Sequence, residues 1–230
     1  MSVTAVPQRT RRRSRNKRVR QRAGGRIRIL AAVLLLLGLV GVIVFLIREG
    51  EGRVISDPRI ARLAALEVPD WVDQQILPEG CDSRRGDLLE ACNGVVIHYV
   101  GNPGTTAAQN RSYYGNPGTK VNSHFLVGLE GEIIQCLPLE EKSSATSERN
   151  RDTISIEVCH PDEEGKFTPE SYASLVRLTA WLMDACELEG EEALLRHYDA
   201  TGKACPIYYV KNEEAWLQLK ADVVAARQNP

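Results

Sequence analysis

The chain has 230 residues, with 29 basic against 30 acidic side chains and 43% hydrophobic residues. Only 18 glycines and 11 prolines accompany this apolar fraction, so the composition excludes a collagen, a coiled coil and a wholly disordered chain. Residues 1–28 hold 11 basic side chains and no acidic one, which leaves 18 basic against 30 acidic side chains in the rest. This asymmetry predicts a basic tail and an acidic domain in different surroundings.

An uncharged segment follows the basic tail. Ile29 to Ile47 contains 19 residues without a charged or hydrogen-bonding side chain, and a helix of that length spans ~28 Å, close to the thickness of bilayer hydrocarbon. A buried core helix is seldom so long without a polar position, and Arg48 to Gly52 offers no cleavage site for a signal peptide. Because basic residues stay on the cytoplasmic side, we expect a single-pass cell-membrane protein with its N-terminus in the cytoplasm.

This topology divides the chain into four parts. Residues 1–28 are the cytoplasmic tail and residues 29–47 the transmembrane helix. Residues 48–80 are charged, with prolines at 58, 69 and 78, and we expect an extracytoplasmic stalk there with one short helix around Ile60 to Leu66. Residues 81–230 are expected to form one folded extracytoplasmic domain.

Strands and helices alternate in that domain. Short apolar, β-branched segments predict strands at Gly94–Val100, Ser123–Val127, Glu132–Leu137 and Thr153–Cys159, and a tight turn at residues 129–132 joins the second and third in a hairpin. Two copies of Gly-Asn-Pro-Gly-Thr, at 101–105 and 115–119, predict loops that flank a helix. Longer helices are expected from Pro169, after the N-cap Thr168, to near Gly190 and from about Asn212 to Arg227. The pattern predicts a single α/β domain whose central mixed β-sheet is covered by helices.

Two histidines and one cysteine form a candidate metal site. His98 lies within an apolar strand, His197 ends a short apolar stretch, and Cys205 follows in a loop eight residues later. Two imidazoles and a thiolate suit zinc, and the fourth tetrahedral position stays open for water in catalytic sites. The spacing alone leaves a hydrogen-bonded core histidine as the alternative.

A series of motifs resembles one known family. They are Val96-Ile97-His98-Tyr99 followed by Gly-Asn-Pro-Gly, Ser123-His124-Phe125-Leu126-Val127, Ile133-Ile134-Gln135, Ser155-Ile156-Glu157-Val158, His197-Tyr198-Asp199 and Gly202-Lys203-Ala204-Cys205-Pro206. In order and spacing, over roughly residues 70–225, they resemble the zinc-dependent N-acetylmuramoyl-L-alanine amidases. That family shares its fold with peptidoglycan recognition proteins and phage amidase-type lysozymes. The basic tail and the apolar segment lie outside the resemblance.

The resemblance implies a role for each matching residue. One zinc ion would be bound by His98, His197 and Cys205. Glu157 would be the catalytic base, because a carboxylate beside the metal can take the proton of the attacking water and deliver it to the leaving amine. Lys203 would stabilise the oxyanion. Without the resemblance, Glu157 would be read as a salt-bridge partner on an edge strand and Lys203 as a solvated loop charge.

Further positions near these motifs carry open alternatives. His124 is either a substrate contact or a hydrogen-bonded structural histidine, and Asn150 is a second candidate for substrate binding. His160 is expected to be a solvated loop residue. Asp199 would either fix the tautomer of His197 or face water.

The sequence also departs from the family pattern. Ser123 stands where phage lysozymes carry a catalytic tyrosine, which favours the glutamate as the base over Tyr99 or Tyr114. The segment Ser143 to Ser147 lacks a histidine that many relatives carry, which leaves the placement of the substrate open.

Six cysteines are present, and five remain when Cys205 is assigned to zinc. In an exported domain up to two disulfides are possible, since Cys81 and Cys92 flank one short segment and Cys136 and Cys159 lie on strands that could be neighbours. The sequence does not decide the pairing. Cys186, on the inward face of a helix, is expected to act as a small hydrophobic residue.

The function implied by the resemblance is that of a membrane-anchored zinc hydrolase. It would cut the amide bond between the lactyl group of N-acetylmuramic acid and L-alanine in peptidoglycan, with a monomeric catalytic domain and no nucleic acid as a partner. One alternative is a binding module of the same fold that holds muropeptides without cutting them. Another is a cysteine amidase or peptidase with Cys205 as the nucleophile.

Overall fold

The computed structural model describes residues 55 and 57–228. The predicted basic tail and transmembrane helix, residues 1–47, lie outside the described residues. In the part that is described, no helix has the length and apolar character needed to cross a membrane.

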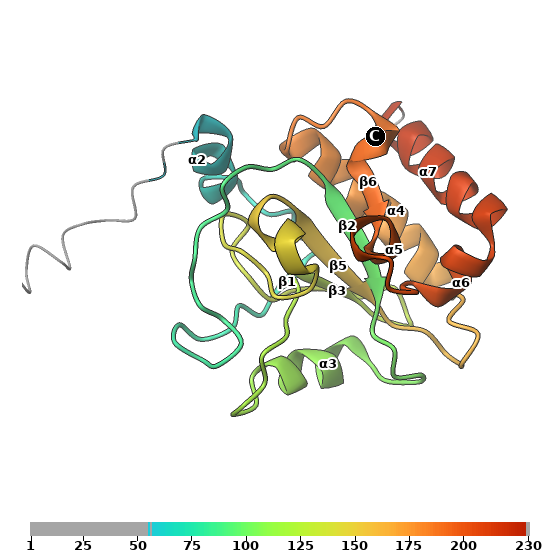
Figure 1. The fold of residues 1–230 in the computed structure, drawn as a ribbon, viewed down its shortest axis with the longest axis horizontal. Helices are drawn as coiled ribbons and strands as arrows, with labels where there is room; N and C mark the ends of the chain where they lie inside the picture. The colour runs from blue at the N-terminus through green and yellow to red at the C-terminus, as the bar shows by residue number, and fades with distance from the viewer. Residues whose placement is uncertain (1–54, 56, 229–230) are drawn as a thin grey trace, which may run out of the picture. The chain divides into compact units, whose positions relative to one another are not determined.

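A six-stranded mixed sheet forms the centre of the described domain (Figure 1). Its strands are β1 (Asp73–Gln74), β2 (Val95–Tyr99), β3 (Phe125–Val127), β4 (Ile133–Gln135), β5 (Ile154–Val158) and β6 (Leu194–Arg196), in the spatial order β1-β4-β3-β5-β2-β6. All neighbours are parallel except the β3–β4 hairpin. The four predicted strands and the hairpin are confirmed, whereas β1 and β6 are too short to show a periodic pattern.

The helices are α2 (Pro58–Ala64), α3 (Ala107–Tyr114), α4 (Pro169–Ala185), α5 (His197–Thr201), α6 (Ile207–Lys211) and α7 (Glu213–Gln228), with 3-10 turns at Ser147–Arg151 and Glu191–Ala193. Thr168 caps α4 as predicted, because its hydroxyl accepts a hydrogen bond from the Ser171 amide at 3.0 Å. The helix ends at Ala185 and not near Gly190, since Glu187 adopts a positive φ of 54° that an α-helix does not continue through. The two repeated pentapeptides flank α3, as expected.

Alternating residues of the strands feed two hydrophobic clusters on opposite faces of the sheet. One cluster includes Ile97, Phe125 and Ile156 and packs against α4 and α7, which lie side by side (Figure 1). The other includes Leu126 of β3 together with Tyr114 of α3. The sheet is therefore covered on both faces, and α3 marks the face opposite α4.

The prediction of a stalk is wrong for residues 55 and 57–80, the part of it that the structure describes. Ile60 and Leu63 of α2 are buried in the main hydrophobic cluster, and β1 pairs with β4. Pro58 stands at the first turn of α2 after the N-cap Asp57, whose carboxylate accepts from the Arg59 amide at 2.7 Å. Pro58, which in the sequence alone indicates a stalk, therefore begins a packed helix. The compact unit begins by Ile55 and not at residue 81.

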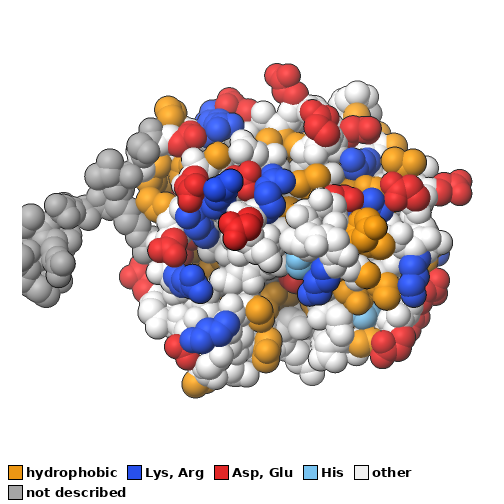
Figure 2. All heavy atoms as spheres, viewed as in Figure 1, with side chains coloured by type: hydrophobic (Ala, Val, Ile, Leu, Met, Phe, Trp, Pro, Cys, Tyr) orange, Lys and Arg blue, Asp and Glu red, His pale blue; other side chains and the backbone are white. Residues whose placement is uncertain are grey.

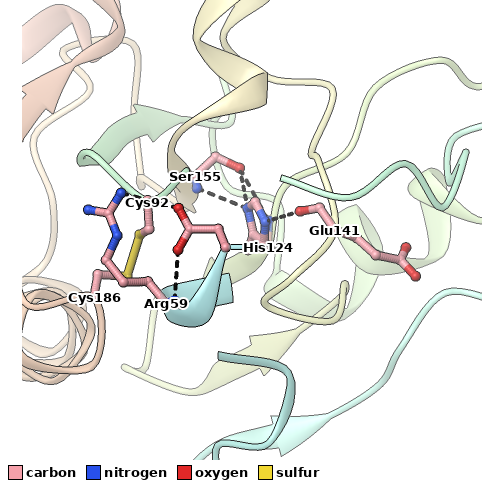
Figure 3. Close-up of a disulfide and its surroundings, with 7 residues drawn as sticks. Arg59, Cys92, His124, Glu141, Ser155 and Cys186 are labelled. Carbon is pink, nitrogen blue, oxygen red and sulfur yellow. Dashed lines mark hydrogen bonds and ion pairs between the residues drawn. A yellow bond between two sulfur atoms is a disulfide. The ribbon is translucent and has the colours of Figure 1, made fainter. Parts of the chain in front are cut away.

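One disulfide joins Cys92, in the loop before β2, to Cys186, the C-cap of α4 (Figure 3). Cys186 is thus not merely a small hydrophobic residue, and neither anticipated pair forms, because Cys81, Cys136 and Cys159 are free in the described domain. The two bonded cysteines are 94 residues apart in the chain. They meet only because α4 packs on the sheet with its end beside the start of β2.

Loss of this disulfide should destabilise the domain. A cross-link over a loop of this length typically contributes about 2–5 kcal/mol, largely by restricting the unfolded chain. We expect Cys92→Ala and reduction of the wild type to lower the thermal midpoint alike, as followed by circular dichroism. Cys81→Ala, which removes a free thiol, is the matched control and should cost less than about 1 kcal/mol. An unchanged midpoint after complete reduction would contradict the prediction.

Candidate functional site

The site starts from two neighbouring parallel strands. β2 and β5 pair in a register that places His98 beside Glu157, while Leu126 of β3 lies beside Glu157 on its other side. Residues paired in this way point to the same face of a sheet. Since Leu126 belongs to the cluster next to α3, His98 and Glu157 also point to that face. The His98 Nδ1 atom lies 3.8 Å from Glu157 Oε1.

His197 and Cys205 reach the same place from the strand on the other side of β2. His197 is the first residue of α5, directly after β6, and Gly202 ends that helix in the left-handed conformation with φ 79°. The chain then returns, and the Tyr198 amide donates to the Cys205 carbonyl at 3.0 Å. Cys205 Sγ lies 3.9 Å from His98 Nδ1, and the two imidazole rings are 4.6 Å apart.

These three side chains could hold a metal ion. All three are buried, and one ligand atom from each lies within 4.8 Å of the others. Burial, then His197 and Lys203, hold the pKa of His98 well below its usual value, and burial followed by Lys203 lowers the pKa of His197. Both imidazoles are therefore neutral, which is the form that binds metals.

Two further observations test the fit. His197 Nδ1 is buried and has no hydrogen-bond partner among the described residues. Burial raises the pKa of Cys205 to about 12, so a thiolate here requires a cation to compensate it. A cation of borderline softness bound by two imidazoles and one thiolate satisfies both.

The position and the raised pKa of Glu157 are those of a proton-transfer group. β5 lies between β3 and β2 in the sheet, so the edge-strand salt bridge considered from the sequence is wrong. Burial raises the pKa of Glu157 to about 8, and the Lys203 charge opposes that rise. Its Oε2 atom has no hydrogen-bond partner in the described structure. A carboxyl group with such a pKa can exchange a proton near neutral pH.

A cavity of about 320 Å³ contains the site. It is lined by Glu157, His197, Lys203 and Cys205, and also by Tyr113 and Val121, whose side chains are 53% and 47% exposed. A second, more polar cavity of about 560 Å³ shares Ser144 and Ala145 with the first. The space-filling view shows basic and acidic side chains interspersed on the face that it presents (Figure 2), so neither charge dominates there.

His124 is a structural histidine. It is fully buried, its Nδ1 accepts from the Ser155 amide at 3.0 Å, and its Nε2 lies 2.8 Å from the Glu141 carbonyl (Figure 3). The substrate-contact alternative for His124 is therefore wrong. Asn150 lines the second cavity and not the one that contains Glu157. Its side-chain oxygen accepts from the amides of Ala145 and Thr146.

Two other expectations are corrected. His160 is 1% exposed, donates through Nδ1 to the Asp162 carbonyl at 2.7 Å and stacks against Tyr99, so it is not a solvated loop residue. Asp199 does not contact His197; its carboxylate binds the backbone amide and the guanidinium of Arg196. His160 packs against Tyr99 and bonds within its own loop, and Asp199, three residues after Arg196, caps the start of α5.

Tyr114 lines the cavity and contacts the buried residue Ser123. The Tyr114 hydroxyl lies 3.2 Å from the Ser123 hydroxyl, which in turn donates to the Phe125 carbonyl at 2.8 Å. Burial, and after it Glu157, raise the pKa of Tyr114 well above its usual value. The phenol therefore stays protonated and cannot serve as a base, in agreement with the preference for the glutamate.

Sequence reasoning missed Thr146. Its hydroxyl lies 3.0 Å from His98 Nε2, and its side chain is fully buried. The residue sits in a Ser-rich loop without periodicity, and its spacing from His98 carries no motif.

A family model described as N-acetylmuramoyl-L-alanine amidase matches residues 89–207. Among curated proteins, the N-acetylmuramoyl-L-alanine amidase BlyA of Bacillus subtilis (strain 168) is 26% identical over 169 residues, which cover 65% of this chain and 46% of BlyA. The amidase CwlL of Bacillus licheniformis is 26% identical over 149 residues, 56% of this chain and 40% of CwlL. The chain thus spans less than half the length of these relatives.

Solved structures show the same fold. A mutant endolysin from Bacillus subtilis is 28% identical with a TM-score of 0.58, and the match covers 66% of this chain and 97% of that one. The catalytic domain of XlyA is also 28% identical with a TM-score of 0.58, over 66% of this chain and 98% of that one. The solution structure of the PlyG catalytic domain, 20% identical with a TM-score of 0.60, agrees in fold over 68% of this chain and 94% of that one.

The burial of His124 should make stability depend on pH. Burial lowers its pKa from 6.5 to about 4 in the folded state, so the unfolded chain binds more protons between these values. The contribution of His124 to the free energy of unfolding is complete above pH 6.5. It is lost as the pH falls toward 4, by up to about 1.4 kcal/mol per pH unit and about 3 kcal/mol in total.

Urea unfolding of the metal-free protein at pH 7.5 and pH 5 measures this effect. His98 and His197 titrate in the same direction, so the contribution of His124 is the difference between the wild type and His124→Gln. The variant should be less stable at pH 7.5 but should lose less stability on acidification. Equal losses in the two proteins would contradict the assignment.

Proposed function

The chain belongs to the N-acetylmuramoyl-L-alanine amidase family, and from this premise we propose that its folded domain hydrolyses the amide bond between the lactyl group of N-acetylmuramic acid and L-alanine in peptidoglycan. One observation carries the proposal. A largely buried carboxyl group with a raised pKa lies beside a His, His, Cys ligand set, in a cavity that Lys203 also lines. That combination serves the hydrolysis of an unreactive amide.

We assign one zinc ion to His98, His197 and Cys205. When bound, zinc polarises a carbonyl oxygen and lowers the pKa of water, which makes amide hydrolysis feasible at neutral pH. His98 and His197 contribute neutral imidazoles, and Cys205 contributes the anionic ligand.

Glu157 moves the proton. Its carboxylate removes a proton from the attacking water and, once protonated, delivers it to the nitrogen of the departing L-alanine. The raised pKa, about 8, favours both halves of this transfer near neutral pH. The unpartnered Oε2 atom leaves one oxygen of the carboxyl group without a competing protein contact.

Lys203 stabilises negative charge. It is exposed on the loop between α5 and α6 and lines the same cavity as Glu157. Its ammonium group donates to the former carbonyl oxygen as that oxygen becomes anionic, an interaction stronger in the transition state than in the substrate.

The two alternatives explain less of the site. A binding module needs neither a complete ligand set nor a carboxyl group with a raised pKa beside it, and both are present. A cysteine nucleophile needs an accessible thiolate, whereas burial raises the pKa of Cys205 and its sulfur faces His98. These observations favour the zinc hydrolase.

We further propose that residues 29–47 anchor the chain in the cell membrane, with the tail in the cytoplasm and a monomeric catalytic domain outside. The 11 basic side chains before that segment support this orientation. The Cys92–Cys186 disulfide also supports it, because such bonds persist in oxidising compartments.

The bond specificity can be tested by mass spectrometry of peptidoglycan digested with residues 53–230. We expect intact glycan strands and free stem peptides that begin with L-alanine, and no release after chelation of the metal. New reducing sugar ends, or activity that resists chelation but not thiol alkylation, would overturn the proposal.

Glu157→Gln tests the mechanism, because it keeps the shape of the side chain and removes the base. We expect kcat to fall by about 10²–10⁴-fold while zinc content stays unchanged. Glu163→Gln, an exposed acidic residue that does not line the cavity, is the matched control and should retain wild-type activity. Full activity of Glu157→Gln with zinc bound would refute the role of Glu157.

Cell fractionation tests the anchor. The full chain should sediment with membranes and resist extraction by high salt, which removes proteins held only by charge, whereas a chain without residues 1–47 should be soluble. Protease added to intact spheroplasts should degrade the catalytic domain. Salt-extractable full-length protein would show that the basic tail, and not the apolar segment, makes the attachment.

A further inference from the structure

We propose that Thr146 is a positioning residue that orients the proposed metal ligand His98, and that the amide side chains of Asn122 and Asn150 hold the loop that carries it in place for this purpose. The inference rests on the proposed metal site. It assigns a role to residues 143–146, a segment in which no motif predicted a function.

The two nitrogens of His98 have different surroundings. Nδ1 lies 3.9 Å from Cys205 Sγ and 3.8 Å from Glu157 Oε1, on the side of the candidate ligands. Nε2 lies 3.0 Å from the Thr146 hydroxyl. Both side chains are almost completely buried, at 1% and 0% exposure, so water does not substitute for this contact.

This arrangement selects one tautomer of the bound form. A neutral imidazole has one N–H group and one lone pair. Binding a metal through Nδ1 places the proton on Nε2, where the Thr146 oxygen accepts it. A ligand histidine held in this way through its outer nitrogen keeps the ring orientation that the metal requires.

The loop around Thr146 is held from two sides. The Asn150 side-chain oxygen accepts from the amides of Ala145 at 3.0 Å and Thr146 at 2.6 Å. The Asn122 side-chain oxygen accepts from the Ser144 amide at 2.6 Å, and its amide nitrogen donates to the Ser83 carbonyl at 2.7 Å. Asn150 precedes β5 and Asn122 precedes β3, so these hydrogen bonds fix the position of Thr146 relative to the sheet that carries His98.

The simpler explanation is that Thr146 only satisfies a buried N–H group. That role would affect the stability of the domain but not its affinity for a metal. Another threonine offers a direct comparison, because Thr153 is also fully buried and its hydroxyl donates to the Arg149 carbonyl at 2.7 Å without touching a ligand.

The experiment measures zinc affinity of the full chain in detergent, by competition with a chromogenic chelator. We expect Thr146→Val, which removes the hydroxyl and keeps the shape, to bind zinc about 10–100-fold more weakly. Thr146→Ser should restore affinity to within about 3-fold of the wild type, since it returns the acceptor. Thr153→Val should lose stability but keep wild-type affinity. The visible spectrum of the Co²⁺-loaded protein should change in Thr146→Val and not in Thr153→Val.

Asn150→Ala provides a second arm that does not alter Thr146. Loosening the loop should weaken zinc binding, and combining it with Thr146→Val should cost less than the two single effects together, because both act through one contact. If Thr146→Val fails to fold, Asn150→Ala with the Co²⁺ spectrum decides the question.

The outcomes separate this inference from the function on which it rests. If Thr146→Val and Asn150→Ala both bind zinc as the wild type does, the positioning role is wrong while the amidase proposal stands. If the wild type binds no zinc, both are wrong. If zinc affinity falls in Thr146→Val, returns in Thr146→Ser and is unaffected in Thr153→Val, the role is supported.

Discussion

The parallel pairing of β2 with β5 is the constraint on which the site depends. In that register His98 stands beside Glu157, and both point to the face that α4 and α7 leave to α3 and the loops. A shift of one residue in either strand would turn one of the two side chains into the apolar cluster around Ile97 and Ile156. The burial of that cluster therefore determines the spacing between the proposed metal ligand and the proposed base.

Some buried polar groups of the domain are paired and others are not. Away from the cavity, His124 bonds through both nitrogens and Arg84 pairs with Glu141 at 2.7 Å, whereas Gln135 Oε1, His160 Nε2 and Thr179 Oγ1 have no partner among the described residues. Within it, His197 Nδ1 and Glu157 Oε2 have no partner among the described residues. An unpaired buried polar atom reduces stability, so its presence in a cavity marks a place where a ligand or a reaction supplies the missing contact. The surrounding sheet and the Cys92–Cys186 disulfide supply stability that offsets this local loss.

The loops determine how the site is completed. β6 and α5 bring His197 and Cys205 beside β2, and the loop of residues 143–146 brings Thr146 against the far side of His98. The side-chain oxygens of Asn122 and Asn150 accept hydrogen bonds from backbone amides of that loop and hold it in place. His98, the proposed metal ligand, is thus held from both directions, by its strand and by this loop.

The sequence by itself determined the charge division, the four principal strands, the capped start of α4 and the three candidate ligands, because alternation, helix caps and motif spacing are local properties of the chain. It predicted Ile60 and Leu63 to lie in a stalk, Cys186 to be unpaired and His160 to be exposed to solvent. Each of these predictions was wrong because the outcome depends on which distant segment packs against the residue. Only the tertiary structure decided that Cys92 meets Cys186 and that the Thr146 hydroxyl contacts His98. Burial and hydrogen bonding between residues far apart in the chain are what set these contacts, and no local pattern encodes them.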